Sequence, residues 1–271
     1  MYNSGKTYIK SLFKKENLKM SRIELFRQHL REKRAVKVIA GIDNFDIENI
    51  KKVVVSANES GASAIDICAD ADIIREVRSM TDLPLFVSSV KPEELVHAVE
   101  LGADAIELGN FDALYKKGAS FTAEDVLSLV HQTIDMLGDN RVFFSVTIPG
   151  DLDVTSQIEL ARKLETMGID LIQTEGYFSA ASQADGVRGL IERAQLTLSN
   201  TIELSRNIDL PIMTASGINP TTAPFAFAAG ASAIGVGSCI NKMDSTLSMM
   251  ATIRNLVEIA EKNTQHVLEL V

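Results

Sequence analysis

Four ionisable residues interrupt or end short apolar segments of the chain. Lys37 lies within AVKVIAG, Asp66 within SAIDICA, Glu107 within ADAIELG, and Glu175 at the end of IDLIQTE. A lysine and several carboxylates gathered in an apolar interior could transfer protons, because burial and neighbouring charges move their pKa values toward neutrality. We therefore take these four residues as candidate catalytic residues.

Small residues end two later segments, which contain the runs TASG and GVGS. Glycine leaves backbone N–H groups uncovered, and a helix that begins there favours a bound anion. Glycine also serves tight turns without any ligand, so each position alone is a weak signal. Taken together they predict a phosphate-binding site made of Ser216, Gly217, Gly235, Gly237 and Ser238.

Eight short segments rich in β-branched residues alternate with helical patterns from residue 35 onward. This alternation is typical of parallel strands joined by helices. An extra helix is expected at residues 21–33, and Pro92 and Pro220 are expected in first helical turns. The predicted strands are Ala35–Gly41, Ser63–Ala69, Pro84–Val90, Ala103–Gly109, Arg141–Ile148, Ile169–Glu175, Pro211–Gly217 and Ser232–Ser238.

The third and fourth predicted strands resemble the seventh and eighth. DLPLFVSSVKP followed by GADAIELGN corresponds to DLPIMTASGINP followed by GASAIGVGS, with one inserted residue. A repeat of two half barrels explains this match, so we predict an eight-stranded parallel β/α (TIM) barrel, with an open doubly wound sheet as the alternative. We expect one barrel domain over residues 20–271 after an N-terminal extension at residues 1–19.

The alternation of side chains along a strand predicts which residues face the barrel interior. Ile65 and Ile67 would face the helices, so Asp66 between them would face inward. A buried lysine must be paired, and Lys37 would find Asp66, Glu107 or both. By the same parity the other inward residues include Lys37, Glu107, Ser145, Thr147, Gln173 and Gly235.

More than one role stays open for these charges. The Lys37 group could be an ion pair that only holds the core together, or it could handle protons at the active end of the barrel. A poorly paired Lys37 could instead form a Schiff base. Glu175 could act as a general base or cap the loop at Gly176, and the loop from Gly176 to Gly189 is a candidate lid.

The composition excludes several classes of partner. A net charge of −9 argues against nucleic acid and anionic membranes, and no apolar run reaches the length of a membrane span. Cys68 and Cys239 form no metal-binding pair, and no cofactor motif is visible. We therefore predict a phosphorylated small-molecule ligand, with no metal and no cofactor; a homo-oligomer stays open.

Several longer runs resemble a known family. They are KVIAGIDNFD, FVSSVKPEEL, IELGNFDALY, FFSVTIPG, IQTEG, TASGINPTTAP and AAGASAIGVGSCINKM. They resemble the family called hypothetical chloroplast reading frame twenty-three, over roughly residues 20 to 257. The resemblance implies a β/α barrel in a plastid stroma (chloroplast) or a cyanobacterial cytoplasm; it implies no reaction and transfers no catalytic residue.

Two features qualify this resemblance. IQTEG continues into Tyr177 and Phe178, where the family pattern leads us to expect a second glycine and a threonine. More distantly, the half-barrel repeat resembles phosphate-binding barrels of histidine and tryptophan synthesis and of thiazole synthase, although only the strand-tip glycines match.

The sequence thus supports two hypotheses. In the first, the protein is a metal-independent isomerase, epimerase or lyase acting on a phosphorylated metabolite at the C-terminal face of the barrel. In the second, it is a non-catalytic sensor of such a metabolite, or a scaffold in a photosynthetic compartment.

Overall fold

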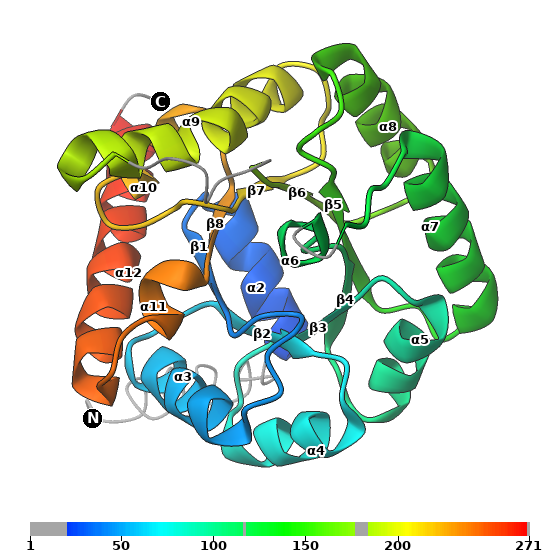
Figure 1. Ribbon diagram of the computed structural model, residues 1–271, viewed down its shortest axis with the longest axis horizontal. Coiled ribbons are helices and arrows are strands. Elements are labelled where there is room, and N and C mark those ends of the chain that lie inside the picture. Colours follow the sequence, from blue (N-terminus) through cyan, green and yellow to red (C-terminus); the bar gives the residue numbers. More distant parts are fainter. Residues whose placement is uncertain (1–20, 116–117, 177–183, 270–271) are drawn as a thin grey trace, which may run out of the picture.

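The computed structural model describes residues 21–115, 118–176 and 184–269. Eight parallel strands close into a barrel in chain order, with helices around it (Figure 1). The closed barrel confirms the predicted fold and excludes the open doubly wound sheet. The strands are β1 (Ala35–Ile39), β2 (Ala64–Cys68), β3 (Leu85–Ser89), β4 (Ala105–Leu108), β5 (Phe143–Ile148), β6 (Leu171–Thr174), β7 (Ile212–Thr214) and β8 (Ala233–Val236).

Helices follow the strands, as the alternation predicts. Several begin at polar caps that satisfy the free N–H groups of the first turn. Asp46, for example, accepts hydrogen bonds from the backbone N–H groups of Glu48 and Asn49 at 3.1 and 3.2 Å. The surrounding helices are α3 (Ile47–Glu59), α4 (Ala71–Met80), α5 (Pro92–Glu100), α7 (Ala123–Leu137), α8 (Val154–Thr166), α9 (Gly186–Ser205), α10 (Ala223–Ala228) and α12 (Thr246–Glu269).

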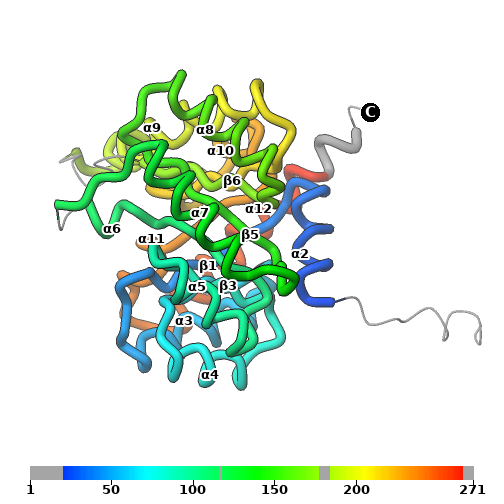
Figure 2. The backbone as a smooth tube through the Cα atoms, turned by 90° about the vertical axis from the view of Figure 1, so that its right-hand side faces the viewer, coloured from blue at the N-terminus to red at the C-terminus, as the bar shows by residue number. Residues whose placement is uncertain are grey.

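Three further helices lie at the two ends of the barrel. The expected extra helix is α2 (Arg22–Arg31), and it covers one end, while α6 (Asp112–Tyr115) and α11 (Ser238–Asn241) lie toward the other (Figure 2). The prediction for Pro92 is confirmed, because Pro92 begins α5. The prediction for Pro220 is wrong, because α10 begins at Ala223.

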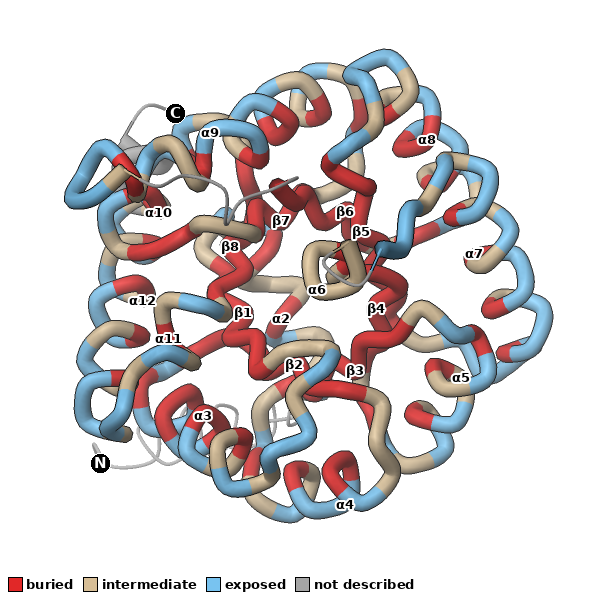
Figure 3. Tube along the Cα trace, viewed as in Figure 1, coloured by how far each residue is buried: buried red, intermediate tan, exposed pale blue. Residues whose placement is uncertain are grey.

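The apolar core is divided by the strands into an outer and an inner part. Residues on the helix-facing side of the strands, Ile65, Ile106 and Ile234 among them, pack with apolar residues of the surrounding helices. The strands are buried, and each surrounding helix has buried and exposed residues (Figure 3). Inside the barrel, Phe86 and Phe143 pack edge to face against Phe26 of α2, which closes the N-terminal end. The polar interior that remains lies above this aromatic layer.

Two predicted segments cannot be assessed. The N-terminal extension at residues 1–19 and residues 177–183 of the candidate lid lie outside the described residues. Within the described part of the chain, no helix is long and apolar enough to span a bilayer.

Candidate active site at the strand tips

The buried lysine of β1 faces two carboxylates inside the barrel. Lys37 Nζ lies 2.5 Å from Glu107 Oε2 and 3.7 Å from Asp66 Oδ2, and the three side chains are at most 1% exposed. Lys37 Nζ also lies 5.0 Å from the centre of the Phe86 ring. The parity argument is therefore confirmed for this group, which β1, β2 and β4 bring together.

Hydroxyl and amide groups donate further hydrogen bonds to these carboxylates. Ser145 Oγ donates to Glu107 Oε2 at 2.8 Å, Gln173 Nε2 donates to Glu107 Oε1 at 2.8 Å, and Ser88 Oγ lies 2.6 Å from Asp66 Oδ1. Burial raises the pKa of Asp66 to about 7; Lys37 opposes this shift, and Glu107 adds to it. With one ammonium for two carboxyl groups, the second carboxyl holds its proton more tightly.

Asn110, just beyond β4, was not predicted from the sequence. Its Nδ2 lies 3.2 Å from Asp66 Oδ2, 3.0 Å from Ser88 Oγ and 3.1 Å from Glu107 Oε1. Its φ of 64° is a left-handed conformation, which asparagine tolerates better than most residues. The available sequence signal is the Gly109-Asn110 pair at the end of the predicted strand Ala103–Gly109.

Glu175 belongs to a second group, in which no cationic side chain of the described residues contacts it. Tyr115 Oη donates to Glu175 Oε1 at 2.7 Å, and the backbone N–H groups of Asp112 and Gly150 approach its oxygens at 3.2 and 3.4 Å. Burial raises the pKa of Glu175 well above its ordinary value, and the charge of Asp112 adds to the shift. Burial therefore favours the protonated form of Glu175, while the hydrogen bonds from Tyr115, Asp112 and Gly150 oppose this shift.

A cavity of about 190 Å³ opens at the C-terminal end of the strands. Glu175, Asn110 and Gln173 line it, whereas Lys37, Asp66 and Glu107 do not. Because Asn110 and Gln173 also hydrogen-bond to Glu107, they separate the cavity from the buried ion pair. We call this space the mouth cavity; its lining includes Ile39, Gly41, Ile42, Asp43, Asn110, Asp112, Ala113, Gln173, Glu175, Ala215, Ser216, Gly217, Ile218, Gly237 and Ser238.

The tips of β7 and β8 meet in this cavity, as the glycine pattern requires. Gly217 and Gly237 both line it, together with Ser216 and Ser238. Among the described residues, the backbone N–H groups of Ser216, Gly217 and Gly237 donate to no other backbone or side-chain group. Ser216 Oγ lies 2.5 Å from Asp112 Oδ2, which links the β7 tip to the Glu175 group.

The glycines are required for different reasons. A Cβ on Gly217 would lie 2.6 Å from the carbonyl oxygen of Arg193 in α9, and its φ is +74°, so the turn and the close helix exclude a side chain there. At Gly237, whose φ is not left-handed, a Cβ would lie 3.3 Å from the Ile39 carbonyl oxygen.

Gly235 lies elsewhere. It is buried within β8 and does not line the mouth cavity; a Cβ there would meet Ala215 at 2.9 Å and Gln173 Oε1 at 3.3 Å. Its smallness therefore serves the packing of the barrel interior.

No group of three or more His, Cys, Asp and Glu side chains is arranged to hold a metal ion in the part of the chain that the structure describes.

Comparison with known proteins gives a family and a set of similar folds. A family model described as "Protein of unknown function (DUF561)" matches residues 20–266. "Uncharacterized protein ycf23" of Pyropia yezoensis is 37% identical over 232 residues, covering 86% of this chain and 84% of that protein. The protein of the same name from Cyanophora paradoxa is 39% identical over 228 residues, covering 84% and 93%.

Solved structures of similar fold include 3-hexulose-6-phosphate synthase, with a TM-score of 0.59, 16% identity and coverage of 83% of this chain and 99% of that one. Thiamine phosphate pyrophosphorylase from Pyrococcus furiosus has a TM-score of 0.55, 17% identity and coverage of 86% and 98%. (S)-3-O-geranylgeranylglyceryl phosphate synthase from Thermoplasma acidophilum, solved with its substrate sn-glycerol-1-phosphate, has a TM-score of 0.56, 16% identity and coverage of 88% and 98%. At such identities the likeness concerns the fold.

Proposed function

The chain belongs to the family described as Protein of unknown function (DUF561), and we propose that it is an enzyme acting on a small phosphorylated metabolite in the mouth cavity. The observation that carries the proposal is one cavity that holds both unpartnered backbone N–H groups and a buried carboxyl group of raised pKa. The first can bind an anion and the second can donate a proton. The reaction needs neither nucleic acid nor a membrane surface.

We assign the phosphate to the tips of β7 and β8. Ser216, Gly217, Gly237 and Ser238 would hold it, because their backbone lines the cavity and three of these N–H groups have no partner among the described residues. Barrels of this class often bind phosphate after their last two strands. The names of the three similar structures each contain a phosphate, which supports this class of ligand for the present chain.

The size of the cavity limits the ligand. A volume of about 190 Å³ lies below the roughly 300 to 1,000 Å³ of sites for drug-sized ligands, which favours a small ligand. A phosphorylated compound of a few carbon atoms fits this space better than a nucleotide does. The metabolite class is therefore a short phosphorylated sugar or heterocycle precursor.

Glu175 is the proton-transfer residue that such a ligand would touch. As a neutral acid it would protonate a carbonyl or leaving-group oxygen, and Tyr115 with the Asp112 and Gly150 N–H groups would then stabilise the carboxylate. The carboxylate could next take a proton from a neighbouring carbon. This sequence is that of an isomerase, an epimerase or a lyase.

The role proposed for the buried group of Lys37, Asp66 and Glu107 is to position Asn110 and Gln173. Their contacts with Asn110 and Gln173 fix the two amides that a ligand would meet. Direct proton transfer by Lys37, Asp66 or Glu107 would require these amides to move aside.

We also propose that the protein works in a plastid stroma or a cyanobacterial cytoplasm, on the basis of the algal relatives.

The test is a thermal-shift screen with phosphorylated compounds of three to six carbons. Ser238→Glu places a negative charge at the proposed phosphate site, whereas Ser199→Glu makes the same change on the exposed surface of α9. A compound that stabilises the wild type and Ser199→Glu, but not Ser238→Glu, supports the site. If no phosphorylated compound raises the melting temperature of the wild type, the proposal fails.

A sensor or scaffold without activity is the second candidate. The observation that favours it is the separation of the buried ion pair from the mouth cavity. Incubation of the stabilising compound with wild type and with Glu175→Gln separates the two functions. Turnover by the wild type that drops by about two orders of magnitude in Glu175→Gln supports the enzyme, while binding without turnover supports the sensor.

A further inference from the structure

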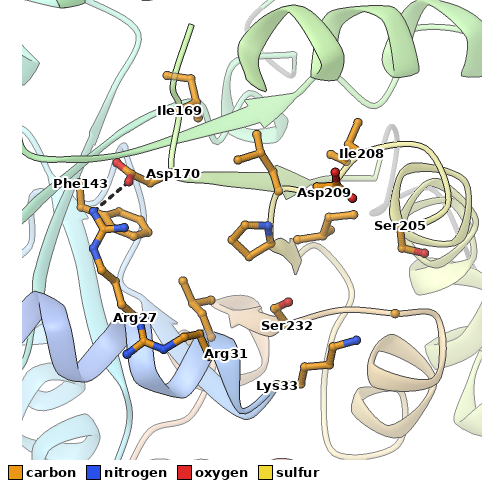
Figure 4. A pocket seen from close by; sticks show the side chains of 15 residues that line it. Arg27, Arg31, Lys33, Phe143, Ile169, Asp170, Ser205, Ile208, Asp209 and Ser232 are labelled. Carbon is orange, nitrogen blue, oxygen red and sulfur yellow. Dashed lines mark hydrogen bonds and ion pairs between the residues drawn. The ribbon is translucent and has the colours of Figure 1, made fainter. Parts of the chain in front are cut away.

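A second cavity, of about 580 Å³, lies at the N-terminal end of the barrel, beneath α2 (Figure 4). Its volume falls within the range of roughly 300 to 1,000 Å³ that is usual for small-molecule sites, unlike the smaller mouth cavity. Helix α2 forms one side, and the segment Ile208–Ile212 that leads into β7 forms another. We call this space the N-terminal cavity.

One wall of the N-terminal cavity is a fixed ion pair. Arg27 donates to Asp170 Oδ1 at 2.8 Å, and the Phe144 N–H donates to Asp170 Oδ2 at 2.9 Å. The guanidinium carbon of Arg27 also lies 4.7 Å from the centre of the Phe143 ring. Both oxygens of Asp170 are thus engaged, and this carboxylate would not repel an anion strongly.

The remaining charges at the cavity are mainly positive. Lys33 is exposed and has no ion-pair partner among the described residues. Arg31 pairs only with Glu24 across 3.1 Å, and because the two side chains are 63% and 44% exposed this pair is weak. Asp209 is the only lining carboxylate without a side-chain partner in the described structure. The lining thus carries three cationic side chains, Arg27, Arg31 and Lys33, against the two carboxylates of Asp170 and Asp209.

The backbone conformation of Lys33 determines where this residue stands at the cavity. Its φ is +52°, a left-handed conformation that normally favours glycine, yet the position holds a long cationic side chain. Asn263 Nδ2 donates to the Lys33 carbonyl at 3.1 Å and fastens this turn to α12. This conformation ends α2, because the Lys33 and Arg34 N–H groups donate to the carbonyls of Leu30 and His29, and it fixes the backbone of Lys33 at the rim of the cavity.

We propose that the N-terminal cavity binds an amphipathic anion, at a site distinct from the mouth cavity. The apolar part of the ligand would lie against Leu30, Phe143 and Pro211, and its carboxylate, sulfonate or phosphate group would face Lys33 and Arg31. The site does not depend on the proposed function, because it shares no lining residue with the mouth cavity.

The experiment uses anilinonaphthalene sulfonate, a fluorescent probe with aromatic rings and one anionic group, on the full chain. We expect a single saturable site. Lys33→Glu should weaken binding about five- to tenfold, because it replaces an attraction by a repulsion. Asp209→Asn should strengthen binding, because it removes the unpaired carboxylate.

Lys91→Glu, on the exposed surface of α5, makes the same change in net charge far from the cavity and should leave binding unchanged. Inorganic phosphate should not displace the probe. The proposal is overturned if the folded protein does not bind the probe saturably. It is equally overturned if Lys33→Glu and Lys91→Glu have the same effect, since binding would then follow net charge alone.

Discussion

The barrel interior contains two buried acidic groups that differ in how they are compensated. In the floor group, the Lys37 ammonium contacts Glu107 and Asp66, and Asn110 and Gln173, which line the mouth cavity, hydrogen-bond to Glu107. In the mouth group, Glu175 is held by a phenol and two backbone N–H groups.

The difference indicates a division of roles. An ion pair in the floor is fixed, since either partner left alone would be an uncompensated buried charge. A carboxyl group at the mouth whose pKa is raised by burial is suited to lose and regain its proton where a ligand binds. The floor group should therefore control stability, and the mouth group should control chemistry.

The largest effect is expected when the floor loses its cation. Lys37→Met leaves Glu107 and Asp66 buried without their partner and should lower the free energy of unfolding by about 3–5 kcal/mol. Urea denaturation of both proteins at neutral pH measures this loss of free energy. The double variant Lys37→Met/Glu107→Gln should recover much of the loss.

Lys91→Met is the matched control, because Lys91 forms an exposed ion pair with Glu94 at 2.7 Å. Its expected cost is at most about 1 kcal/mol. If Lys37→Met costs no more than this control, the floor group is not the structural element that we infer.

The pH dependence of stability comes next. The pKa of Asp66 is raised from 3.8 to about 7 in the folded protein, so between these values the unfolded chain binds fewer protons than the folded one. The contribution of Asp66 to the free energy of unfolding is therefore fully present below its ordinary pKa of 3.8, and it is lost as the pH rises toward 7. The wild type should lose more than about 1.4 kcal/mol relative to Asp66→Asn between pH 4 and pH 8, since one pKa unit is worth that much.

Unfolding free energies of the two proteins at a series of pH values measure this difference. Glu175→Gln should remove a second part of the same slope, because the pKa of Glu175 is also raised by burial. Parallel pH profiles for wild type and Asp66→Asn would contradict the prediction.

Asn110 hydrogen-bonds to the floor group and lines the mouth cavity, and its backbone conformation permits a finer comparison. Asn110→Ala and Asn110→Gly both remove the hydrogen bonds of Nδ2, but alanine also has to adopt the left-handed φ of 64°. We expect Asn110→Ala to be less stable than Asn110→Gly by about 1 kcal/mol. Equal stabilities in urea denaturation would argue that the turn relaxes and that Asn110 does not hold a fixed position.

The smallest effect on stability is expected at the mouth. Glu175→Gln keeps the shape of the side chain and removes a buried ionisable group, so it should cost less free energy of unfolding at neutral pH than Lys37→Met does. Turnover, in contrast, should be lost. A destabilisation as large as that of Lys37→Met would mean that Glu175 is ionised and structural.

Much of this architecture could be predicted from the chain alone. The alternation of isoleucine with polar residues places Asp66 and Glu107 inside the barrel, because successive side chains of a strand point to opposite faces. The closed barrel and the shared cavity of Gly217 and Gly237 also agree with the repeat of two half barrels. These are local patterns, or patterns that repeat at a fixed spacing.

The parts that could not be predicted depend on contacts between distant segments. Asn110 meets Asp66 across 44 positions of sequence, and Tyr115 meets Glu175 across 60. Nor could the sequence reveal that Gly217 is required by the backbone of α9, or that a larger cavity lies under α2. Strand parity determines only the face on which a side chain lies.

The sequence by itself determined the barrel, the inward direction of its charged residues and the glycine tips, because periodicity and backbone freedom are properties of short segments. Only the tertiary structure decided that the Lys37 group is closed off while Glu175 lines the mouth cavity. The physical reason is that burial and pKa depend on every element packed around a group, and eight strands and their loops contribute to that environment.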